Sequence, residues 1–134
     1  MKRSLERQVW KRANSRCEYC QMSQEHDAVS FEIDHVIAVS HAGPSRAKNL
    51  ALACFLDNSY KGPNLAGIDP RTKRITPLFN PRRQQWRRHF RWDGPVLVGR
   101  TAAGRATIAV LRINLPHRIA QREALIEEGV FPPG

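Results

Sequence analysis

Apolar residues near the start of the chain recur at the spacing of one helical face. This pattern predicts a helix from about Lys2 to Arg12, with a buried stripe formed by Leu5, Val9, Trp10 and Ala13. The next segment, Arg16 to Glu25, has no clear period and is interpreted as a turn. From Phe31 to Val39 apolar and polar positions alternate, and β-branched and aromatic residues are frequent, so we expect a strand there.

The segment after this strand predicts a loop, a second short element and a helix. Ser40 to Lys48 contains the Gly43-Pro44-Ser45 run, which is typical of a loop. Asn49 to Cys54 fits a second short strand or the start of a helix. Phe55 to Lys61 predicts a short helix that ends at Gly62-Pro63. The expected local order is therefore strand, loop, strand, helix.

The next part of the chain predicts a hairpin followed by a helix. The hairpin is expected within residues 67–79, and Asp69-Pro70 supplies its turn. Asn80 followed by Pro81 is typical of a helix start. We expect this helix to run through Trp86 to about Phe90.

The last third of the chain predicts another hairpin and a final helix. Residues 91–101 fit the hairpin, whereas residues 104–113 fit either a buried helix or a strand. The final helix is expected to begin near Asn114 and Pro116 and to end at Gly129.

The length suits one domain, and the charge indicates an acidic partner. We expect a single domain over residues 1–134. Lysine and arginine total 22 against 12 acidic residues, which gives a formal net charge of +10. Such an excess favours binding to nucleic acid, because cations that neutralise phosphates release the counterions of the backbone. Solubility alone and binding to anionic membranes are the alternatives.

Two further features concern the cellular compartment. No apolar run approaches the roughly 18–20 residues that cross a bilayer, and the first residues lack the apolar stretch of a signal peptide. We therefore expect a cytoplasmic protein without membrane contact. Three cysteines are present, and in a reducing compartment Cys17-x-x-Cys20 indicates thiolate metal ligands more than a disulfide.

Several short segments carry informative polar residues in a fixed order. They are Glu32-Ile33-Asp34-His35-Val36-Ile37, His41-Ala42-Gly43-Pro44, Asn49-Leu50, Cys54 and Asn58-Ser59-Tyr60-Lys61. An adjacent Asp34-His35 pair alone indicates little, because most such pairs are a surface carboxylate beside a histidine. The ordered set, preceded by Cys17-x-x-Cys20, resembles the signature of the HNH endonuclease family.

The resemblance implies an α+β fold with a ββα-metal (HNH or His-Me finger) core and flanking helices and hairpins. The core would lie at about residues 15–65, followed by a basic C-terminal extension over residues 66–134. Residues 62–70 and 78–82 also resemble small stand-alone bacterial HNH proteins. This similarity favours a complete single-domain protein over a fragment of a larger enzyme.

The resemblance also implies a role for each residue of the signature. Asp34 and Asn58 would hold one divalent ion, Mg²⁺ or Mn²⁺, since these hard ions prefer oxygen ligands. A histidine can accept a proton from water at neutral pH, so His35 is expected to be the general base. Asn49 would orient the site through its amide. Lys61 fits either a phosphate contact one helical turn from Asn58 or an exposed helix lysine.

The cysteines depart from the family pattern. Many HNH proteins that resemble this one hold a structural zinc with two Cys-x-x-Cys pairs, but here the second pair reads Cys54-Phe55-Leu56-Asp57. A zinc site of Cys17, Cys20, Cys54 and Asp57 is chemically conceivable. Structural zinc sites favour sulfur and imidazole over carboxylate, so the sequence favours three buried thiols that pack as small apolar groups.

A basic segment follows the signature. Trp86 and Phe90 are four residues apart and are expected to be buried together on the predicted helix. The arginines around them are Arg82, Arg83, Arg87, Arg88 and Arg91. We interpret them as a surface that follows the phosphates of a nucleic acid, with a merely solvated helix as the alternative.

The sequence therefore predicts a metal-dependent endonuclease that hydrolyses phosphodiester bonds in DNA, most simply duplex DNA. One alternative is a nuclease that acts on RNA or on a particular nucleic-acid structure. The other is a nucleic-acid-binding module that keeps the fold without turnover, because a fold does not guarantee a function.

Overall fold

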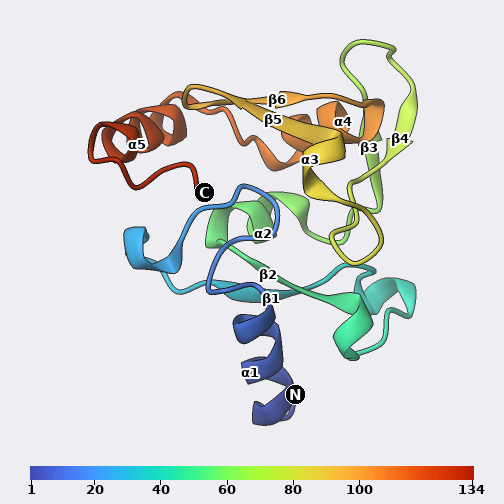
Figure 1. The fold of residues 1–134 in the computed structure, drawn as a ribbon. Coiled ribbons are helices and arrows are strands. Elements are labelled where there is room, and N and C mark those ends of the chain that lie inside the picture. The colour runs from blue at the N-terminus through green and yellow to red at the C-terminus, as the bar shows by residue number, and fades with distance from the viewer.

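The computed structural model describes residues 1–134 and is centred on one short hairpin and the helix that follows it (Figure 1). β1 (Glu32–His35) and β2 (Leu50–Ala53) pair antiparallel, with His35 opposite Leu50. α2 (Phe55–Lys61) follows β2 directly and packs against β1. The predicted α+β fold, with its strand–loop–strand–helix order, is confirmed.

β1 ends earlier than the alternating pattern predicts. The sequence extends the strand to Val39, but a 3-10 turn forms at Val39–His41. The Asn49 side chain accepts a hydrogen bond from the Ile37 amide at 2.9 Å and donates one to the Ile37 carbonyl at 3.0 Å. These bonds satisfy the backbone that a longer strand would have paired, so the chain can leave the hairpin.

α1 (Arg3–Arg12) lies on the face of the hairpin opposite to α2, as its label below β1 and β2 shows (Figure 1). The predicted helix is confirmed. Val9 is fully buried, and the ring of Trp10 stacks on Phe31 with 6.3 Å between centroids. The apolar stripe of the sequence therefore anchors this helix to the sheet.

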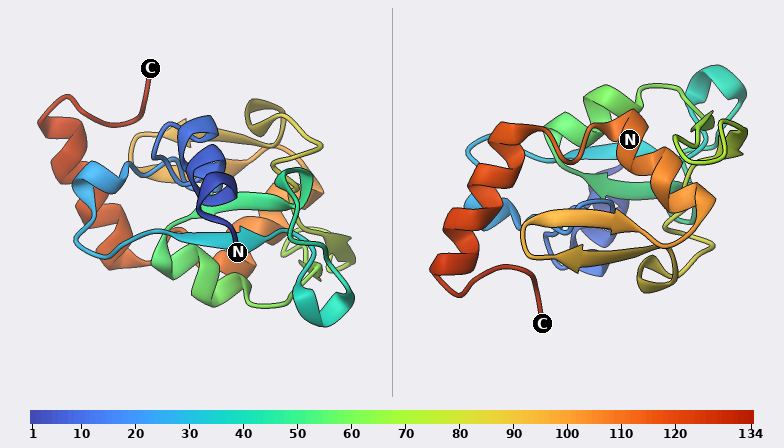
Figure 2. Two further views of the ribbon diagram at one scale, coloured as in Figure 1. Left: turned by 90° about the horizontal axis from the view of Figure 1, so that it is seen from below. Right: turned by 90° about the horizontal axis from the view of Figure 1, so that it is seen from above.

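The C-terminal half forms a second layer over this unit, seen from below and from above in Figure 2. Its helices and strands are β3 (Ala66–Ile68), β4 (Ile75–Pro77), α3 (Trp86–His89), β5 (Phe90–Asp93), β6 (Val96–Gly99), α4 (Ala102–Leu111) and α5 (Pro116–Glu127). Both predicted hairpins and the final helix are confirmed. Residues 104–113 lie largely in α4, and the Thr101 hydroxyl caps its start by accepting from the Gly104 amide at 3.1 Å.

The long helix expected from Asn80 to Phe90 is wrong. Only the four residues of α3 are helical, and the chain before them forms a turn. The Asn80 side chain accepts from the Arg82 amide at 2.9 Å, and the Asn80 amide donates to the Gln84 side chain at 2.8 Å. Asparagine followed by proline is as typical of such a turn as of a helix start, because both need the same local geometry.

One apolar cluster joins the two layers. Phe79 lies at its centre, with ring centroids 6.4 Å from Tyr19 and 5.2 Å from Phe90. The indole of Trp86 donates to the Tyr19 carbonyl at 2.7 Å. The loop that carries Cys17 and Cys20 is therefore held between β2 and the C-terminal half.

Candidate functional site

Asp34 is a buried carboxylate near the end of β1. It is 4% exposed, and it accepts a hydrogen bond from the Tyr19 hydroxyl at 2.6 Å and from the Lys61 ammonium at 3.2 Å. Burial raises the pKa of Asp34, and the charge of Lys61 opposes this rise. The pairing compensates a charge that would otherwise be costly to bury.

Lys61 lies on α2 one turn after Asn58, as the sequence predicts, but its side chain is buried and not exposed. Its side chain is 2% exposed, and besides Asp34 its ammonium donates to the carbonyls of His35 at 3.4 Å and Val36 at 3.1 Å. Neither an exposed helix lysine nor an open phosphate contact describes it in this structure. The reason is that the end of β1 offers one carboxylate and two carbonyls, which together satisfy all three ammonium donors.

His35 follows Asp34 directly and leaves the strand on the other side, as adjacent strand residues do. Its ring is half-buried. The Nε2 atom lies 2.9 Å from the hydroxyl of Ser45, an exposed residue in the loop between β1 and β2. Sequence reasoning did not identify Ser45, because no spacing rule links a loop serine to the strand it faces.

Asn49 ties that loop to the end of β1. Its side-chain amide donates to the Pro44 carbonyl at 2.9 Å in addition to its two bonds with Ile37. A Cβ at Gly43 would overlap the carbonyl oxygen of Ile37, so only glycine allows the loop to approach this closely. Asn49 and Gly43 together hold the Pro44-Ser45 segment beside His35.

The signature residues provide oxygen donors of the type that a hard divalent ion prefers. Asp34 offers a carboxylate, and Asn58 lies half-buried on α2 one turn before Lys61. The donor chemistry therefore fits Mg²⁺ or Mn²⁺. Lys61 and Tyr19 each donate to one oxygen of the Asp34 carboxylate, and each oxygen keeps a further lone pair for an ion.

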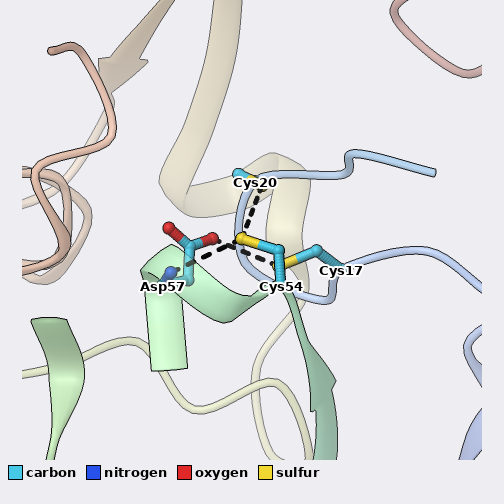
Figure 3. Close-up of side chains that lie close together, drawn as sticks. All are labelled: Cys17, Cys20, Cys54 and Asp57. Atoms are coloured by element: carbon cyan, nitrogen blue, oxygen red, sulfur yellow. Dashed lines mark hydrogen bonds between the residues drawn. The ribbon is translucent and has the colours of Figure 1, made fainter. Parts of the chain in front are cut away.

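The three cysteines and Asp57 come together in a buried cluster between the Cys17–Cys20 loop and the start of α2 (Figure 3). Their ligand atoms all lie within 4.8 Å of one another. Cys20 and Cys54 have their sulfurs 3.8 Å apart, and the Cys17 thiol donates to Asp57 Oδ2 at 3.1 Å. The cluster could therefore hold a metal ion.

Arg118 of α5 closes the cluster from the C-terminal layer. It is 4% exposed and donates to Asp57 Oδ1 at 2.7 Å, which leaves Oδ2 directed at the sulfurs. Burial, followed by the charge of Cys20, raises the pKa of Asp57 to about 7. Hydrogen bonds from Cys17 and Cys54 lower the pKa of Cys20, so the cluster favours one thiolate beside the guanidinium.

The predicted arginine surface is only partly present. Arg82 forms a salt bridge with Glu18 and is mostly buried, so it isn't an open contact on a helix face. The other members are exposed, on the turn, α3 and β5: Arg83, Arg87, Arg88 and Arg91. Because the expected helix is replaced by a turn, the five arginines do not share one helix face.

Comparisons with known proteins agree with the local signature. A model of the family described as HNH endonuclease matches residues 17–64, the span from the first cysteine to just after α2. No curated protein and no solved structure gives a significant match. None of the helices is both long and apolar enough to pass through a membrane.

Proposed function

Because residues 17–64 belong to the HNH endonuclease family, we propose that this chain is a metal-dependent endonuclease that hydrolyses phosphodiester bonds in DNA. One observation carries the proposal. The ββα unit brings Asp34 and His35 at the end of β1 together with Lys61 of α2, within a signature that the family model matches. The excess of 22 basic over 12 acidic residues favours a polyanionic substrate.

His35 is the proposed general base. If Nε2 donates its hydrogen to the Ser45 hydroxyl, the lone pair of Nδ1 remains free to accept a proton. The proton of the attacking water then moves to Nδ1, the water oxygen bonds to phosphorus, and the bond from phosphorus to the 3′ oxygen breaks. The departing oxygen takes up a proton from solvent.

Asp34 and Asn58 are the proposed ligands of the divalent ion. When bound, the ion supplies positive charge that stabilises the phosphorane-like transition state and the departing oxygen. Tyr19 holds the carboxylate of Asp34 in place through its 2.6 Å hydrogen bond. Lys61, which lines the adjoining hollow, is proposed to attract the phosphate by its charge.

Asn49 and Ser45 are proposed to position the base. Asn49 fixes the loop through Ile37 and Pro44, and the adjacent Ser45 meets the His35 ring. Hydrogen-bond partners of this kind set the tautomer and orientation of a catalytic histidine.

We also propose that the cluster of Cys17, Cys20, Cys54 and Asp57 holds a structural zinc ion. Two sulfurs on a tetrahedral zinc with bonds of about 2.3 Å stand roughly 3.8 Å apart, and Cys20 and Cys54 already lie 3.8 Å apart. A site of Zn²⁺, three thiolates and one carboxylate carries a total formal charge of about −2. The positive charge of the buried Arg118 guanidinium offsets part of this negative charge.

The zinc proposal differs from the sequence-based prediction, which favours three buried thiols without a metal ion. What supports the change is the orientation of Asp57 by Arg118, a contact across 61 residues. Such a cluster needs reduced thiols, and the three cysteines are free, which is consistent with a reducing compartment such as the cytoplasm.

The substrate is tested by parallel cleavage assays on duplex DNA, single-stranded DNA and RNA of one sequence. We expect cleavage of duplex DNA in the presence of Mg²⁺ or Mn²⁺. If the chain cleaved RNA but neither form of DNA, its substrate would be RNA and the DNA part of the proposal would be wrong. Binding to nucleic acid without cleavage of any of the three would instead identify a binding module without turnover.

A further inference from the structure

A basic groove runs along the end of the β1–β2 hairpin. It consists of two hollows of about 360 Å³ and about 630 Å³ that share Ile37, Asn80 and Arg83 in their walls. Lys61, the partner of Asp34, lines the smaller hollow. The larger one extends away from it toward Arg12 at the end of α1. The groove thus runs from Lys61 to the end of the N-terminal helix.

The walls of the groove carry positive charge only. Neither hollow is lined by an aspartate or a glutamate, whereas five cationic residues line the two: Arg12, Lys48, Lys61, Arg82 and Arg83. Burial lowers the pKa of Arg82 to about 10, and the charge of Arg12 adds to this decrease. An anion bound between these cations would relieve the repulsion.

Several donors of the groove have no partner within the chain. The side chains of Lys48 and Arg83 are exposed and form no hydrogen bond or salt bridge. Nε of Arg82 is the buried side-chain atom without any hydrogen-bond partner, although its Nη2 binds Glu18. Nε of Arg82 is closed to solvent, so the donors open to an external acceptor are those of Lys48 and Arg83.

Arg12 fixes the far end of the groove. Its guanidinium donates to the carbonyls of Ala47 at 2.8 Å and Leu50 at 2.6 Å, which locks the long side chain in one conformation. A cation that is already ordered loses less conformational entropy when an anion binds beside it.

We propose that this groove binds the phosphodiester backbone of one DNA strand and leads it from Arg12 toward Lys61, the partner of Asp34. The inference rests on the proposed function for the direction of the strand, but the binding itself does not depend on cleavage. The sequence predicts that one arginine-rich helix face binds the phosphates. In the structure the groove is instead formed by α1, the β1–β2 loop and the Asn80–Arg83 turn.

The test measures binding of a short fluorescein-labelled DNA duplex by fluorescence anisotropy in buffer without Mg²⁺, Mn²⁺ or chelator, from about 50 to 200 mM salt. The variant is Lys48→Gln/Arg83→Gln, which removes two charges that make no contact within the chain. The matched control is Arg71→Gln/Arg74→Gln, which removes two exposed charges from the β3–β4 turn outside the groove.

For the groove variant we expect the affinity for DNA to fall about tenfold or more. The slope of log affinity against log salt should become shallower by the amount that corresponds to about two lost phosphate contacts. The control should stay close to the unmodified chain. Equal losses in both variants, or no loss in the groove variant, would overturn the proposal. Because the assay contains neither Mg²⁺ nor Mn²⁺, this result is independent of whether the chain proves to be a nuclease.

Discussion

Replacement of His35 by alanine is expected to lower the single-turnover rate of DNA cleavage by about 10²- to 10⁴-fold, the usual contribution of a general base. The imidazole is the group proposed to take the proton of the attacking water. Binding without Mg²⁺ or Mn²⁺ should be little changed, because His35 carries no phosphate contact in the proposed track. The measurement is the rate at saturating enzyme with Mg²⁺.

His41→Ala is the matched control for this variant. His41 is exposed in the 3-10 turn of the same loop and is not assigned a catalytic role. Its replacement should leave the rate within a few-fold of the unmodified chain. If both variants lost activity equally, or if His35→Ala cleaved at the original rate, His35 would not be the base. Circular dichroism of both variants separates a catalytic loss from unfolding.

Protein purified without added zinc is expected to contain about one zinc ion per chain. Removal of that ion should destabilise the fold by on the order of 3 kcal/mol or more, because the free energy of zinc binding contributes directly to folding. For a chain of this size the melting temperature then falls by roughly 10 °C. Metal content is measured by mass spectrometry, and unfolding is followed with and without a strong chelator.

Asp57→Asn tests the fourth ligand. The substitution keeps the size of the side chain and an oxygen that can accept from Arg118, but it removes the carboxylate charge. Its zinc content and melting temperature should both fall, whereas Asp93→Asn, at an exposed site on β5, should retain both. Unmodified protein that contains no zinc and unfolds at the same temperature with or without chelator would contradict the zinc proposal.

The local order of the core could be predicted from the sequence because neighbouring residues determine it. Alternation before Asp34, the glycine and proline of the loop, and the short apolar run after Asn49 each indicate their own element. The Asn80-Pro81 pair does not distinguish a turn from the first turn of a helix. The hydrogen bonds that Asn80 forms with Arg82 and Gln84 decide between the two structures.

The contacts that define the site could not be predicted, because they join distant segments. Lys61 reaches Asp34 across 27 residues, and Arg118 reaches Asp57 across 61. Periodicity predicts that a residue is buried or exposed on its own element, but it does not identify the partner that makes a buried charge tolerable. For a lysine at the end of a short helix, the sequence therefore predicts either a phosphate contact or an exposed side chain, and not an ion pair with Asp34.

The basic groove illustrates the same limit. Net charge predicts a polyanionic partner, and the arginine-rich segment suggests where it binds. The groove instead combines Arg12, Lys48 and Arg83 from three separate segments, which no pattern along the chain connects.

The most direct test of the central claim is conversion of supercoiled plasmid by the purified chain with Mg²⁺, with Mn²⁺ and with chelator. We expect nicked or linear product with at least one of the two ions and none in chelator, with activity restored when the ion is returned. No conversion under any of these conditions, or equal conversion in chelator, would contradict a metal-dependent endonuclease.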